Sequence, residues 1–217
     1  MNKRIAIVVG VLMSLSACSS NPPPPDWAGE AKGSSERATE AWLSGNSRIE
    51  MAEFNRARAE VARTGQVALV ARLELLRCAT RVASLVVERC VGFEALAQDA
   101  APADLAYARY LAGNAQAADA ALLPEVHRAL VGNATPDAAL ASIQDPLSQL
   151  VAAGVLFRSG RATPGVMAQA VDTASARGWR RPLLAWLQVQ HQRAQAAGDA
   201  QAAARLQRRI DLVAPAR

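Results

Sequence analysis

The chain has 217 residues, a formal net charge of +5 and a hydrophobic fraction of 51%. Aromatic residues make up only 4% of it, alanine is abundant and β-branched runs are scarce, so good helix formers dominate and strand signals are nearly absent. The composition therefore excludes a β-rich fold and predicts an all-α one.

The beginning of the chain has the pattern of an export signal. Lys3 and Arg4 precede a mostly apolar run from Ile5 to Ala17, and a cationic start before a short apolar core is typical of signal peptides. A membrane-spanning helix needs about 20 apolar residues. The run is therefore too short to remain as a span, and residues 1–17 are predicted to be removed.

The run ends in Leu15-Ser16-Ala17-Cys18, which resembles the lipobox of bacterial lipoproteins. The resemblance implies transfer of a diacylglyceryl group to the Cys18 thiol, cleavage between Ala17 and Cys18, and acylation of the new amino group; a free cysteine after an ordinary signal is the alternative. At about 0.8 kcal/mol per buried methylene, several chains give near-permanent attachment. Ser19 stands where the inner-membrane retention signal has Asp, so the resemblance implies a location at the outer membrane, facing the periplasm.

Residues 18–33 are expected to form the lipidated cysteine and a proline-rich tether, followed by a helical domain over residues 34–217. The four prolines at 22–25 favour polyproline II, a semi-rigid spacer of about 3.1 Å per residue; a ligand for a proline-reading module is the weaker alternative. Cleavage leaves 200 residues (217 minus 17) and lowers the formal charge to +3, because Lys3 and Arg4 are lost. Export removes nucleic acid as a partner, so the arginines are interpreted mostly as solvated helix faces.

Capping residues, prolines and glycines mark the expected helix boundaries. Ser47-Arg48-Ile49-Glu50 has a capping-box pattern and opens a helix that ends at Gly65, with one side formed by Ile49, Phe54, Ala57 and Val61. Three more starts place a capping residue before a proline at the first helical position: Thr135-Pro136, Asp145-Pro146 and Thr163-Pro164. Stops are expected at glycines: Gly45, Gly113, Gly132, Gly160, Gly178 and Gly198. Short turns between helices predict antiparallel neighbours.

A nine-residue pattern occurs twice, at residues 38–46 and 106–114: Ala, three residues, an aromatic, Leu, a small residue, Gly and Asn. The offset of 68 (106 minus 38) is twice the 34-residue tetratricopeptide period. The pattern resembles tetratricopeptide-type helical hairpins, with Ala118 and Leu122 giving the small and large positions after the second copy. Departures from the motif are Glu50, Gln207 and Pro124. The resemblance implies a tetratricopeptide-like α-solenoid of antiparallel helical hairpins; an irregular helical bundle is the alternative.

Cys78 and Cys90 remain once Cys18 is lipidated, and in an oxidising compartment they are expected to form a disulfide. Twelve positions of continuous helix span about 18 Å, whereas a disulfide requires α-carbons within about 7 Å. The helix that carries Cys78 must therefore end near Leu85, and the segment through Gly92 must fold back. Two buried thiols are the alternative.

No catalytic, metal or cofactor motif is found. His127 and His191 each stand without a second ligand at helical spacing, so hydrogen-bonding or solvated helical histidines are expected. The sequence contains no G-x-S-x-G, H-E-x-x-H or phosphate-loop motif. Trp42 and Trp186 are predicted to lie in the core and Trp179 at a turn. The following carboxylates are interpreted as solvent-facing members of helix ion pairs: Glu36, Glu40, Glu50, Glu53 and Glu60.

The sequence thus favours a non-enzymatic, lipid-anchored interaction module of the envelope, with envelope proteins and the membrane as partners and no cofactor, nucleic acid or small-molecule substrate. An enzyme or enzyme activator acting on cell wall and a purely structural envelope protein are the alternatives. Three glutamines share one helix face after an apolar set of Leu183, Leu184, Trp186 and Leu187. They are expected to help form a protein-binding groove, with plain solvated surface as the alternative: Gln188, Gln192 and Gln195.

Overall fold

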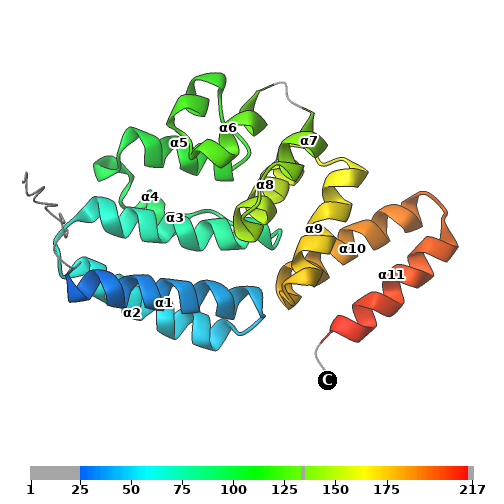
Figure 1. Ribbon diagram of the computed structural model, residues 1–217, viewed down its shortest axis with the longest axis horizontal. Coiled ribbons are helices and arrows are strands. Elements are labelled where there is room, and N and C mark those ends of the chain that lie inside the picture. The colour runs from blue at the N-terminus through cyan, green and yellow to red at the C-terminus, as the bar shows by residue number, and fades with distance from the viewer. Residues whose placement is uncertain (1–24, 133–134, 215–217) are drawn as a thin grey trace, which may run out of the picture.

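The computed structural model describes residues 25–132 and 135–214, and within these ranges every regular element is a helix (Figure 1). This confirms the all-α prediction. In chain order the α-helices are α1 (Asp26–Leu43), α2 (Ser47–Ala62), α3 (Val67–Ala83), α4 (Val91–Glu94), α5 (Pro102–Leu111), α6 (Glu125–Val131), α7 (Pro136–Ala141), α8 (Pro146–Arg158), α9 (Pro164–Ala176), α10 (Arg180–Ala196) and α11 (Ala200–Val213), with two 3₁₀ helices, η1 (Ala97–Asp99) and η2 (Ala117–Leu122).

The helical domain begins at residue 26, earlier than the boundary at residue 34 that the sequence predicts. Helix α1 starts at Asp26, directly after Pro25 at its N-cap, so residues 26–33 belong to the helix and not to the tether. An acidic residue in the first turn is favourable because of the helix dipole, which explains the start. The expected signal peptide, Cys18 and most of the proline run lie outside the described residues.

Regular antiparallel hairpins form the two ends of the molecule, α1–α2 and α10–α11 (Figure 1). Each turns at a glycine in the left-handed region, Gly45 with φ +92° and Gly198 with φ +72°, a conformation that costs side-chain-bearing residues energy. Most of the predicted glycine stops are confirmed in this way. Gly132 differs: its φ is −90°, so α6 ends in extended backbone.

The N-terminus of α2 corrects the predicted capping box. Asn46, not Ser47, is the N-cap, and its side chain accepts a hydrogen bond from the Ile49 amide. In this helix Ile49 is half exposed, whereas Glu50 faces inward and is buried. The three predicted Pro starts are confirmed at α7, α8 and α9.

Helices α3 and α8 lie at the centre of the molecule and pack directly against each other. The crossing is close because α8 carries Gly154 there: a Cβ at this position would lie 2.2 Å from the Val82 carbonyl oxygen. Every residue of α8 from Gln149 to Leu156 is buried. The uninterrupted apolar run of this helix is thus explained by contacts on all sides.

The middle of the chain does not repeat the hairpin of the N-terminal end. The second copy of the nine-residue pattern does end α5 at a left-handed glycine, Gly113, but the return segment is the short η2, which stops before Pro124. Ala118 is exposed and Leu122 is 43% exposed, so the predicted small-and-large packing pair is wrong. Proline lacks the amide hydrogen that a longer helix would need.

Residues at the start of α10 contact the C-terminal end of α1. Trp179 donates from Nε1 to Glu40 Oε2 at 2.9 Å, and Arg181 donates from Nε to the Trp42 carbonyl oxygen at 2.7 Å. The guanidinium carbons of Arg81 and Arg181 lie 3.3 and 3.7 Å from the centroid of the Trp42 ring. At these distances they must occupy opposite faces of the indole, which is clamped between two cations. Trp42 and Trp186 are both buried core residues, as predicted.

Candidate functional site

The predicted disulfide is present and reverses the chain after α3. Cys78 and Cys90 are bonded with their α-carbons 5.9 Å apart, and α3 ends at Ala83. Leu85 adopts a φ of +57° because no glycine is available at this helix end, and the amide of Val86 donates back to the Arg81 carbonyl oxygen. The chain therefore folds back close to where the spacing of the two cysteines requires.

A partly open cavity of about 320 Å³ lies beside this disulfide. Five parts of the chain surround it: the end of α3, the loop to Cys90, α4, the end of α5 and the end of α8. Its apolar lining includes the disulfide and the buried side chains of Val82, Phe93 and Leu111. A second cavity of about 350 Å³ shares the disulfide as a wall and extends to Trp42. The two together form the candidate site.

A buried ion-pair cluster supports the α3 side of the site. Glu50 is only 4% exposed and accepts hydrogen bonds from Arg77 Nε at 2.9 Å and Arg81 Nη2 at 3.0 Å. The interpretation of Glu50 as a solvent-facing residue is therefore wrong: it joins α2 to α3. By contrast, Glu60 pairs with Arg63 on its own helix, as expected. Glu53 contacts Arg56 of its own helix at 3.7 Å, but its shorter ion pair, at 2.9 Å, is with Arg37 of α1.

Arg81 contributes to both cavities and is largely desolvated. Its side chain is 9% exposed, and burial lowers its pKa, with Glu50 opposing that effect. Its Nη1 has no hydrogen-bond acceptor among the described residues. The stacking of its guanidinium on Trp42 at 3.3 Å fixes this cation in place.

Arg158, at the end of α8, is a cation without a carboxylate partner in the described part of the chain. Its Nη1 and Nη2 donate to the carbonyl oxygens of Leu111 and Val86, and its Nε has no acceptor there. Burial lowers its pKa, opposed by the charge of Glu88. Arg158 thus ties α5 and the disulfide loop to α8 while its own charge is not neutralised by direct contact.

The remaining rim arginines are paired with acids. Arg89 pairs with Glu94, and Arg109 pairs with Asp119 through two hydrogen bonds. The bond from Arg109, together with one from the Gln116 amide, lowers the pKa of Asp119 to about 2. These pairs leave Arg158 as the cavity cation that lacks a counter-ion.

His127 has the hydrogen-bonding role that the sequence predicts, but in the core. It is 2% exposed, and its Nδ1 lies 3.1 Å from Tyr110 Oη, with the Tyr107 ring stacked on it. Burial lowers the pKa of His127 to about 4. Across residues 25–132 and 135–214, no group of three or more His, Cys, Asp or Glu side chains could hold a metal ion. His191 instead lines a groove on α10.

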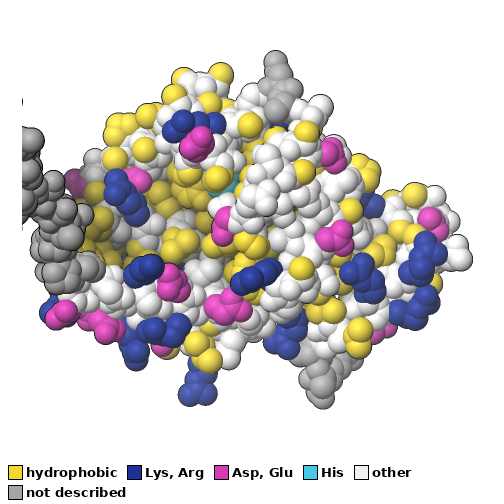
Figure 2. Space-filling view, in the orientation of Figure 1, with side chains coloured by type: hydrophobic (Ala, Val, Ile, Leu, Met, Phe, Trp, Pro, Cys, Tyr) yellow, Lys and Arg dark blue, Asp and Glu magenta, His cyan; other side chains and the backbone are white. Residues whose placement is uncertain are grey.

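The predicted glutamine face is exposed, but the structure brings only part of it into a hollow. Gln195 lines a shallow groove of about 420 Å³ between α10 and α11, with an alanine-rich floor that includes Ala203. Gln188 and Gln192 are exposed outside that groove. Figure 2 shows Lys and Arg side chains gathered over α11, with hydrophobic side chains between them; Leu212 of this helix is 85% exposed.

Sequence reasoning missed the cavity arginines. Arg158 follows an apolar run from Leu150 to Phe157, and a single charge at the end of a buried run was the signal that could have identified it. Arg81 likewise lies among Cys78, Ala79, Val82 and Ala83. No described helix is both long and apolar enough to cross a bilayer. No protein-family model, curated protein or solved structure matches this chain.

Proposed function

We propose that this chain is a lipid-anchored envelope protein that faces the periplasm and binds another protein, without itself catalysing a reaction. The observation that carries the proposal is the cavity beside the Cys78–Cys90 disulfide, which combines an apolar lining with an arginine-rich rim. Concave, mostly apolar sites with a few polar groups are typical of the binding of small ligands, and a site of this size accepts a short protruding part of a partner protein. A disulfide and an ion-paired cluster hold the walls in position, which reduces the ordering cost of binding.

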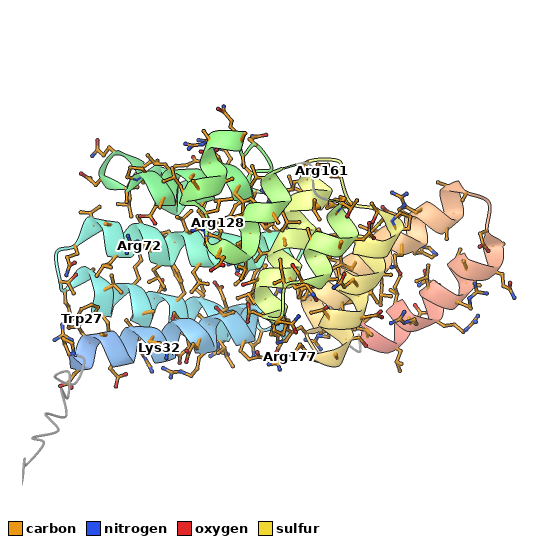
Figure 3. The ribbon with its side chains drawn as sticks, turned by 45° about the horizontal axis from the view of Figure 1, so that its top comes forward. Trp27, Lys32, Arg72, Arg128, Arg161 and Arg177 are labelled. Carbon is orange, nitrogen blue, oxygen red and sulfur yellow. A yellow bond between two sulfur atoms is a disulfide. The ribbon has the colours of Figure 1, made fainter. Side chains whose placement is uncertain are left out.

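The sequence at the N-terminus supports the anchor. Residues 15–18 resemble a lipobox, and the prolines at 22–25 supply a semi-rigid spacer. The disulfide supports export, because disulfides persist in oxidising compartments. Trp27 lies at the N-terminal end of α1, where the spacer joins the domain, and the α10–α11 hairpin lies at the other end of the molecule (Figure 3). The far hairpin is thus held away from the attachment point.

Site-specific photo-crosslinking in intact cells tests the proposal. A photoreactive residue at Ala112, which is exposed at the rim of the cavity, should form an adduct with one defined envelope protein. The matched control is Ala103, which is exposed on helix α5, the helix that Ala112 caps, but does not line the cavity. An adduct from Ala112 and none from Ala103 is the expected result.

A third position separates the two candidate surfaces. An adduct from Gln192 but not from Ala112 would assign binding to the glutamine face that the sequence predicts. Absence of adducts from both positions in cells that contain the anchored protein would overturn the proposed function.

A further inference from the structure

We infer that the cavity beside the disulfide binds the C-terminus of a polypeptide whose last residue is apolar, and that Arg158 pairs with the terminal carboxylate. This inference rests on the proposed function and names the part of the partner that enters the site. The observations that carry it are the charge of Arg158, which no carboxylate of the described residues contacts directly, and the apolar lining next to it.

The charge of Arg158 favours an anionic ligand. A guanidinium has five N–H donors, and here Nη1 and Nη2 are used toward the carbonyl oxygens of Leu111 and Val86, which carry no formal charge. The other cations of the rim have acidic partners: Arg89 with Glu94, and Arg109 with Asp119. A carboxylate beside Arg158 would therefore add a charge-assisted hydrogen bond without breaking an existing ion pair.

The lining of the cavity and the acidic residues at its rim indicate which class of anionic ligand fits, namely the C-terminus of a polypeptide. The apolar wall of Val82, Phe93, Leu111 and the disulfide suits an apolar side chain, and a volume of about 320 Å³ is near the lower end of ligand-sized pockets. Only at its C-terminus does a polypeptide carry an apolar side chain and a carboxylate on the same residue. Glu88 and Glu94 also line the cavity and repel carboxylates, so a ligand with a single carboxylate placed directly against Arg158 fits better than one with several.

The test uses the full-length chain in detergent and two fluorescent pentapeptides, Ser-Gly-Ser-Ala-Leu as the free acid and as the C-terminal amide, followed by fluorescence anisotropy. We expect the acid to bind at least tenfold more tightly than the amide, because a hydrogen bond to a charged group is worth more than one to a neutral group. The variant Arg158→Gln should remove this preference, and Arg158→Lys should retain part of it. Equal binding of acid and amide by the unmodified protein would overturn the inference, and this comparison does not depend on any variant folding.

Two further arms identify the site and the ligand class. Ala108→Phe fills the cavity from α5 and should weaken binding of the acid at least tenfold, whereas Ala103→Phe adds the same ring to an exposed position of the same helix and should not. Unchanged binding in Ala108→Phe would place the ligand elsewhere and overturn the inference. Hexanoate that competes as well as the peptide acid at equal concentration would identify a fatty-acid carboxylate and overturn the peptide assignment.

The outcomes separate this inference from the proposed function. An adduct from Ala112 in cells, together with equal binding of acid and amide, would support the proposed function and contradict the inference that a C-terminus enters the cavity. Binding of the peptide acid in vitro without any adduct in cells would contradict the proposed function.

Discussion

Acidification should destabilise this protein through one histidine. Burial lowers the pKa of His127 to about 4, partly opposed by the charge of Asp145, whereas the unfolded chain takes up a proton below about pH 6.5. Between pH 6.5 and 4 the unfolded state therefore binds more protons, and the free energy of unfolding falls as the pH falls. At 1.36 kcal/mol per pKa unit the full loss is about 3 kcal/mol, of which roughly 2 kcal/mol is reached by pH 5.

Urea unfolding at pH 7 and pH 5, followed by far-UV circular dichroism, measures this loss. The chain has two histidines, so each provides a control for the other. His127→Gln removes the buried titrating group and should abolish most of the pH dependence in this window. His191→Gln changes a half-buried residue of the α10 groove and should retain it. If His127→Gln keeps the full loss between pH 7 and pH 5, the reasoning from burial is refuted.

Four further outcomes are expected. Cys18→Ser should release the protein from membranes and abolish labelling by a palmitate analogue; labelling of neither form would contradict the anchor. Reduction of the Cys78–Cys90 disulfide should lower the free energy of unfolding by about 3 kcal/mol in the chain-entropy model, and two reactive thiols in the denatured, unreduced protein would contradict the bond. Gly154→Ala should lower the free energy of unfolding by about 1–3 kcal/mol, because α8 and α3 must separate. Gly29 has open space around it, so Gly29→Ala should raise the free energy of unfolding by roughly 0.5–1 kcal/mol. Equal effects of the two variants in urea unfolding would contradict the close crossing. If the glutamine face forms a docking groove, partner capture should weaken, without loss of helicity, when Glu replaces all three of its residues: Gln188, Gln192 and Gln195.

Local signals predicted most of the helix boundaries. Pro136, Pro146 and Pro164 begin helices, and left-handed glycines such as Gly45 end them, because these backbone preferences depend on neighbouring residues alone. The disulfide was predicted from the two cysteines that remain in an exported chain, and chain geometry then gave the place where the helix of Cys78 has to end.

The candidate site was not predictable because its parts interact across long separations. The charge at the end of an apolar run could have drawn attention to Arg158, but its partner, the carbonyl oxygen of Val86, lies 72 positions earlier, and no local pattern reports such a contact. Glu50 was assigned to solvent because glutamate usually is exposed; its burial depends on Arg77 and Arg81, which lie on another helix. Glu50 lies on the face of α2 that packs against α3, and that packing is a tertiary contact that a capping pattern does not report.

The packing of Trp42 between two arginines is completed only after the C-terminal part of the chain has been synthesised. One face of the indole is covered by Arg81. The other face is covered by Arg181, which lies 139 positions after Trp42. A chain delivered N-terminus first can form the α1–α2 hairpin early, yet its first helix keeps an uncovered aromatic face until α10 arrives. A nonsense mutation just ahead of residue 180 would therefore expose part of the first helix, far along the chain from the lesion, in addition to the face of α9 that α10 covers.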